Sequence, residues 1–134
     1  MIQFTIPIEP TAQARARHTK QGRTYKCAKQ KANERTLEAL LVPHRPDTPI
    51  QGPVGIEIRA FMAIAKSKSK KFREAAIRGY ERPTKKPDID NILKQICDTM
   101  TRLQFWNDDV QVCHVAASKE YSEKPRWEIT VEEI

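Results

Sequence analysis

The chain has 134 residues, of which 39% are hydrophobic and 31% are charged, and its formal net charge is +7. This length and composition predict one compact domain spanning residues 1–134. No apolar run approaches the roughly 18 residues that a membrane span needs, and the N-terminal residues show no signal-peptide pattern, so we expect a cytoplasmic protein. Three cysteines at irregular spacing argue against a disulfide framework or a zinc knuckle.

Alternating or helical spacing of apolar residues predicts a series of strands and helices. In chain order they are a strand at 2–8, helix at 28–42, strand at 54–64, short helix at 72–80, helix at 89–103, strand at 110–117 and strand at 127–131. Residues 110–117 are apolar on both faces, which is typical of a central strand. We therefore expect a single small α+β domain, a mixed sheet of about four strands with two to three helices packed on it.

The basic residues are concentrated in two segments. Residues 12–35 hold eight Lys or Arg and one acid, and residues 66–86 hold nine Lys or Arg and two acids, so each segment carries a net charge of +7. The remainder of the chain is therefore acidic. This asymmetry favours nucleic acid as the partner, and the alternative is a merely solvated surface.

Five of the six aspartates also cluster, namely Asp88, Asp90, Asp98, Asp108 and Asp109. One explanation is that Asp88 caps the helix and Asp90 interacts with its dipole, effects of about 0.5–2 and 0.3–1 kcal/mol. However, two carboxylates ~5 Å apart repel by about 3 kcal/mol at an effective dielectric constant near 20. A cation would offset that repulsion, and carboxylates without Cys or His favour Mg²⁺ or Mn²⁺ over zinc.

The apolar stripe of the helix at 89–103 places Asp90 and Lys94 together on the opposite face, followed by Asp98. Lys94 could simply form an i,i+4 ion pair with Asp90, worth about 0.3–0.5 kcal/mol. Alternatively, its ammonium group could neutralise charge on a phosphate that is being displaced, or orient the attacking water.

Two motifs carry a resemblance to a known family. Residues 86–94 read K-P-D-I-D-N-I-L-K, and residues 105–112 read F-W-N-D-D-V-Q-V, followed by Lys119. This long pattern resembles the signature of the RusA-type Holliday junction resolvases. Weaker similarity at Arg17-His18 and at residues 22–25 extends it over nearly the whole chain, although residues 66–86 are longer and more basic than in compact members.

The resemblance implies a homodimeric, Mg²⁺-dependent endonuclease that nicks four-way DNA junctions symmetrically during recombination and repair, with Mn²⁺ as a substitute. Such enzymes are often encoded by phages and prophages. It also implies that Asp88, Asp90 and Asp109 hold the metal and that Lys94 is the catalytic lysine. We expect attack of metal-bound water on the phosphodiester, leaving a 5'-phosphate and a 3'-hydroxyl. Asp108 and Asn91 are candidates for supporting positions, and the predicted DNA contacts are Arg15, Arg17, Lys20, Arg23, Lys85, Lys86 and Lys119.

Two other functions are compatible with the same residues. A non-catalytic nucleic-acid-binding module would use the aspartates to shape a turn, and a nuclease selective for other branched DNA, such as flaps, would share the chemistry.

Among the remaining residues, Phe105 and Trp106 are expected to pack under the Asp-Asp turn rather than stack on a base. Cys97 and Cys113 are expected to be buried thiols.

Overall fold

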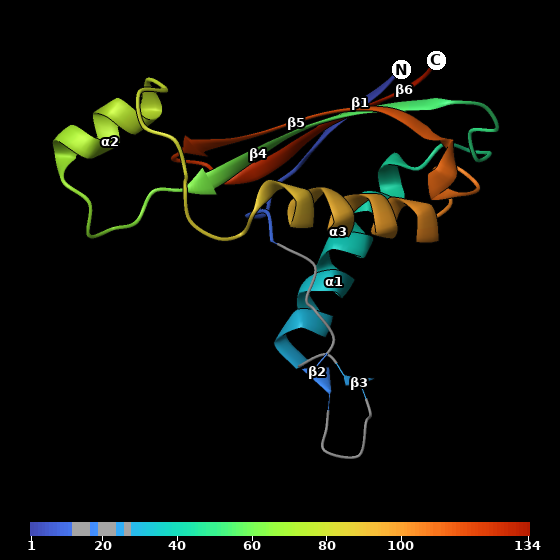
Figure 1. Ribbon diagram of the computed structural model, residues 1–134, viewed down its shortest axis with the longest axis horizontal. Coiled ribbons are helices and arrows are strands. Elements are labelled where there is room, and N and C mark those ends of the chain that lie inside the picture. Colours follow the sequence, from blue (N-terminus) through green and yellow to red (C-terminus); the bar gives the residue numbers. More distant parts are fainter. Residues whose placement is uncertain (12–16, 19–23, 26–27) are drawn as a thin grey trace.

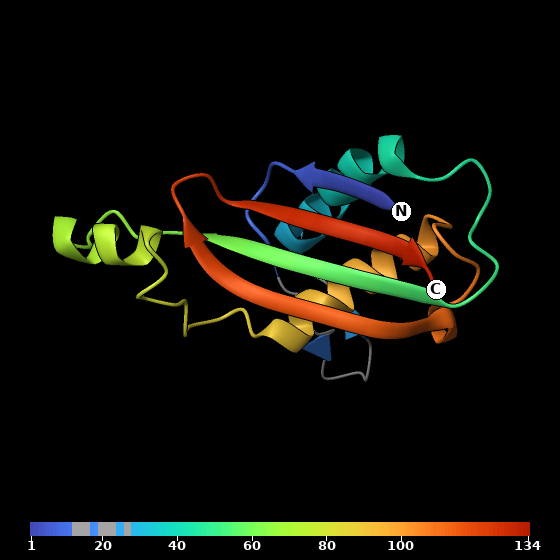
Figure 2. The same ribbon diagram turned by 90° about the horizontal axis from the view of Figure 1, so that it is seen from above.

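A computed structural model of the protein describes residues 1–11, 17–18, 24–25 and 28–134. Its centre is a four-stranded mixed sheet in the order β1-β6-β4-β5 (Figure 2). β6 is antiparallel to both β1 and β4, whereas β4 and β5 are parallel. The strands are β1 (Ile2–Ile6), β4 (Val54–Ala63), β5 (Val112–Ser122) and β6 (Arg126–Glu133). These strands confirm the four predicted from the alternating apolar residues.

Two helices cover one face of this sheet, α1 (Ala28–Leu41) and α3 (Ile89–Arg102) (Figure 1). Their apolar stripes bury Leu37, Leu41, Ile92, Ile96 and Met100 against the inward side chains of the strands. The predicted α+β class is thereby confirmed. Within the described ranges, no helix is long and apolar enough to cross a bilayer.

The third helix, α2 (Lys70–Ile77), lies beyond the end of the sheet (Figures 1 and 2). Ser69 caps its N-terminus by accepting a hydrogen bond from Phe72 N, and Gly79 ends it at a φ of 84°. Ala76 is buried, but most of the helix is exposed. We call residues 66–86, which contain α2 and nine bases, the basic arm.

Shorter elements complete the described chain. β2 (Arg17–His18) and β3 (Thr24–Tyr25) form a separate antiparallel pair. Two 3₁₀ turns, η1 (Val42–His44) and η2 (Asp109–Gln111), follow α1 and α3 respectively.

β5 corrects one expectation from the sequence. It pairs only with β4, so it is an edge strand of this sheet and not the central strand predicted from its apolar residues. Residues 113–117 are exposed, and Val110 just before the strand is 80% exposed. Cys113 is therefore exposed rather than buried, while Cys97 is half-buried. An apolar pattern predicts that a strand is shielded, but it does not say by which element.

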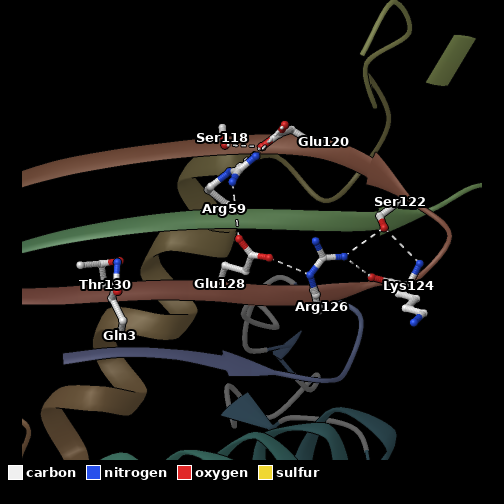
Figure 3. Close-up of polar contacts among 9 residues, drawn as sticks. All are labelled: Gln3, Arg59, Ser118, Glu120, Ser122, Lys124, Arg126, Glu128 and Thr130. Atoms are coloured by element: carbon white, nitrogen blue, oxygen red, sulfur yellow. Dashed lines mark hydrogen bonds and ion pairs between the residues drawn. The ribbon is translucent and has the colours of Figure 1, made fainter. Parts of the chain in front are cut away.

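The outer face of the sheet is polar, and its charges are paired with one another (Figure 3). The Arg59 guanidinium contacts Glu120 at 3.0 Å and Glu128 at 3.5 Å, and Arg126 contacts Glu128 at 2.8 Å. Both arginines stack on the Phe61 ring. The hydrogen bond from Arg59 lowers the pKa of Glu120. This face therefore presents little uncompensated positive charge.

Candidate active site

The first turn of α3 carries two of the predicted metal ligands. Asp88 occupies the N-cap position, but its side chain makes no capping hydrogen bond to the helix backbone. Instead, the Asn91 amide donates to Asp88 Oδ1 at 2.7 Å, so Asn91 orients that carboxylate. Asp90 is exposed in the same turn. Because this end of a helix carries partial positive charge, it stabilises both carboxylates before any cation binds.

Lys94 lies one turn further along α3. The ion pair that it makes is with Asp98, at 3.2 Å from Nζ to Oδ2, and not the predicted one with Asp90. The pair is exposed, so its contribution to stability is small, about 0.3–0.5 kcal/mol. Its consequence is geometric, because Asp98 holds the ammonium group over the middle of the helix.

The turn after α3 delivers Asp108 and Asp109. Phe105 and Trp106 are fully buried beneath it, as the sequence predicted. The Trp106 indole donates to Thr101 Oγ1 at 2.7 Å, which fastens the turn to α3. Ile50 N donates to the Phe105 carbonyl at 2.9 Å, which fastens it to the connector before β4.

Gln111 makes four hydrogen bonds that fix this turn. Its Oε1 accepts from the backbone N–H groups of Asn107 and Asp108, both at 2.8 Å. Its Nε2 donates to the carbonyls of Ile50 at 2.8 Å and Gly52 at 3.0 Å. Sequence reasoning assigned no role to Gln111. The signal was present in the spacing, since Asp108 and Gln111 form a capping box around η2.

The two adjacent carboxyls of the turn share a hydrogen bond and differ in acidity. The backbone N–H of Val110, followed by the hydrogen bond with Asp109, lowers the pKa of Asp108. The hydrogen bond with Asp108 raises the pKa of Asp109, and the negative charge of Asp98 acts in the same direction. Lys94 opposes this shift. Asp109 therefore lies within electrostatic reach of both members of the ion pair on α3.

The structure brings together only part of the predicted set. The charges of Lys94 and Asp98 act on Asp109, while Asp88 and Asp90 lie at the start of α3. Within the described part of the protomer, no three His, Cys, Asp or Glu side chains converge closely enough to hold a metal ion. The donor chemistry nevertheless suits Mg²⁺, because exposed carboxylates are its usual protein ligands and one or two of them are sufficient alongside water and phosphate oxygens.

The predicted DNA-binding residues have different outcomes. Lys85 and Lys86 are exposed just before Asp88. Lys119, on β5, donates to the Lys85 carbonyl at 2.8 Å, so its ammonium group fastens the basic arm to the sheet. Arg17 lies in β2. The other candidates, Arg15, Lys20 and Arg23, fall outside the described residues.

Replacing Gln111 with Leu should destabilise the fold by about 2 kcal/mol, because several backbone groups lose their partners together. Urea unfolding measures this change. Gln51→Leu is the matched control, since Gln51 makes only two exposed hydrogen bonds and should cost less than about 0.5 kcal/mol. Equal destabilisation by the two variants would show that Gln111 has no special structural role.

In metal-free protein, Asp109 should titrate above Asp108 when carboxyl carbons are followed by NMR. Asp108→Asn should lower the pKa of Asp109, because the substitution removes the neighbouring negative charge that favours the protonated acid. The ionised form of Asp109 would then persist to lower pH than in the wild type. An unchanged or higher Asp109 pKa in the variant would contradict the shared hydrogen bond.

The chain is similar to known proteins over nearly its whole length. The sequence model of the RusA endodeoxyribonuclease family matches residues 7–132. The uncharacterized protein YqaN of Bacillus subtilis (strain 168) is 38% identical, covering 99% of this chain and 96% of YqaN. The crossover junction endodeoxyribonuclease rusA of Lactococcus phage r1t is 28% identical, covering 98% and 96% respectively. The match over nearly the full length shows that the chain belongs to the RusA family of endodeoxyribonucleases.

Proposed function

We propose that this endodeoxyribonuclease resolves four-way DNA junctions by paired, symmetric nicks in a Mg²⁺-dependent reaction. The observation that carries the proposal is that η2, which holds Asp109, contacts α3, so that the charges of Lys94 and Asp98 act on Asp109. Two consecutive elements, α3 and η2, thereby carry carboxylates and a lysine on their exposed surface. The junction-cleaving name of the phage relative supports the choice of substrate, and recombination and repair are the processes in which such junctions arise.

Asp88, Asp90 and Asp109 would hold the metal ion, and Mn²⁺ would substitute for Mg²⁺. When bound, such an ion stabilises charge on phosphate oxygens and makes water a better nucleophile. Asn91 keeps Asp88 oriented, and Lys94, held by Asp98, would donate hydrogen bonds to the phosphate as its charge grows. In-line attack by water on phosphorus would break the bond to the 3'-oxygen, which leaves a 5'-phosphate and a 3'-hydroxyl.

We also propose that the protein is a homodimer joined along the β5 edge. The unpaired side of β5 offers backbone hydrogen-bonding groups, and exposed apolar residues lie along the same strand. A second copy would cover both. A two-fold symmetric pair also presents two active sites, which matches a junction that must be cut in two strands.

The first experiment compares Asp90→Asn with the wild type on a synthetic four-way junction. The variant should bind the junction yet nick it more than about 100-fold more slowly, since it loses a group at the reacting centre. Asp47→Asn is the control, because Asp47 is the one aspartate outside the cluster, and it should nick like the wild type.

Several results would contradict the proposal. Full activity of Asp90→Asn would disprove the proposed role of Asp90 in catalysis. A wild type that is inactive with both Mg²⁺ and Mn²⁺ would favour a non-catalytic nucleic-acid-binding module. A wild type that cleaves flaps or linear duplex faster than four-way junctions would show that the proposed substrate is wrong.

The dimer is tested by sedimentation velocity of two equivalent variants. Val115 on β5 and Val42 in η1 are 40% and 42% exposed, so a change to Asp alters the surface equally. Val115→Asp should sediment as a monomer, because its charge would be buried against the second copy. Val42→Asp should remain a dimer. A monomeric wild type, or a dimeric Val115→Asp variant, would disprove the β5 interface.

A further inference from the structure

A cleft separates α2 from the returning part of the basic arm. Its volume is about 270 Å³. Four of the bases of the arm line it, namely Lys68, Arg82, Lys85 and Lys86. Two acids, Glu9 and Glu81, also line it, and Glu9 is engaged by the Ala63 backbone N–H at 3.0 Å. The cleft is therefore net positive.

The bases of the arm are not neutralised by ion pairs in the described part of the chain. The ion pairs found there involve Arg59, Lys94, Arg102 and Arg126, all outside the arm. This contrasts with the outer face of the sheet, where arginines and glutamates pair with one another. Unpaired, exposed cations in a concave surface attract a polyanion, and its binding releases counterions.

Aromatic rings form part of the same wall. Lys68 Nζ lies 4.7 Å from the centroid of the Phe72 ring, and Phe72 packs edge-on against Tyr121 with centroids 5.8 Å apart. Both rings line the cleft and are half-buried. Cations beside aromatic rings are the combination that binds unpaired nucleotides, because phosphates meet charge and bases meet ring faces.

The cleft is also tied to the active site. Asp88 follows Lys86 after a single proline, and Lys119 holds the Lys85 carbonyl against β5. A DNA strand with a phosphate near Asp88 could thus continue directly into the cleft.

We propose that this cleft binds the DNA strand at the branch point, where base pairing is interrupted, and thereby gives the enzyme its preference for branched over linear DNA. The inference rests on the proposed junction-cleaving function and adds the element that selects the substrate. Lys68 and Arg82 contact phosphates of the unpaired strand, beside Phe72 and Tyr121.

The test neutralises the cleft in the full-length protein with Lys68→Gln/Arg82→Gln. Fluorescence anisotropy in Ca²⁺ gives affinities for a four-way junction, a single-stranded oligonucleotide and a linear duplex. Junction and single-strand affinities should fall about tenfold, and the slope of log affinity against log salt should shrink by about 1.5, as expected for two lost phosphate contacts. Duplex affinity should fall less than threefold. Circular dichroism confirms that the variant is folded.

Lys70→Gln/Lys71→Gln is the matched control, because it removes two charges from the same arm at positions that do not line the cleft. It should weaken junction binding less than threefold. Equal losses in the two double variants, equal losses for junction and duplex, or no loss at all would overturn the proposal. A wild type that binds the junction through the cleft without nicking it would instead refute the proposed function alone.

Discussion

The site depends on holding several like charges on one exposed surface against their mutual repulsion. Asp108 and Asp109 are adjacent in sequence, and neither can move away because Gln111 fixes the backbone on both sides of them. The neighbouring carboxyl raises the pKa of Asp109 through their shared hydrogen bond, and the negative charge of Asp98 acts in the same direction. A structure that concentrates carboxylates in this way sacrifices some stability for a position where a cation could bind.

The charges of the molecule divide into two kinds. On the outer face of the sheet, arginines form ion pairs with glutamates, and Arg126 also stacks on the Phe61 ring. The charges of that face therefore compensate one another. On the basic arm, no cation forms an ion pair among the described residues, although the charge of Arg82 acts on Glu120 of β5. Net charge alone does not distinguish these cases. It is the pairing pattern that identifies the arm, and not the sheet, as the surface that would meet DNA.

Local periodicity was sufficient to predict the four main strands and the helices, because each element buries one apolar stripe. It could not place β5 at an edge, since the apolar residues on both faces of 110–117 do not say which element covers them. The motif located the aspartates, but side-chain partners depend on packing between segments. Lys94 therefore pairs with Asp98 rather than Asp90, and Lys119, predicted as a DNA contact, donates to the Lys85 carbonyl. The role of Gln111 could have been predicted from its spacing to Asp108, because a capping box is a local sequence pattern.

Lys119 is one of the contacts that join β5 to the basic arm, beside the packing of Phe72 on Tyr121. It belongs to β5, the strand along which we propose that the dimer forms. Its ammonium group donates a hydrogen bond to the carbonyl of Lys85, which lies two residues before Pro87 and just before the start of α3. Any displacement of β5 on dimer formation would therefore act on the arm and on the carboxylate of Asp88 together. Among the described residues the three expected carboxylates do not converge, so a metal ion held by one or two of them would complete its coordination with water and phosphate oxygens.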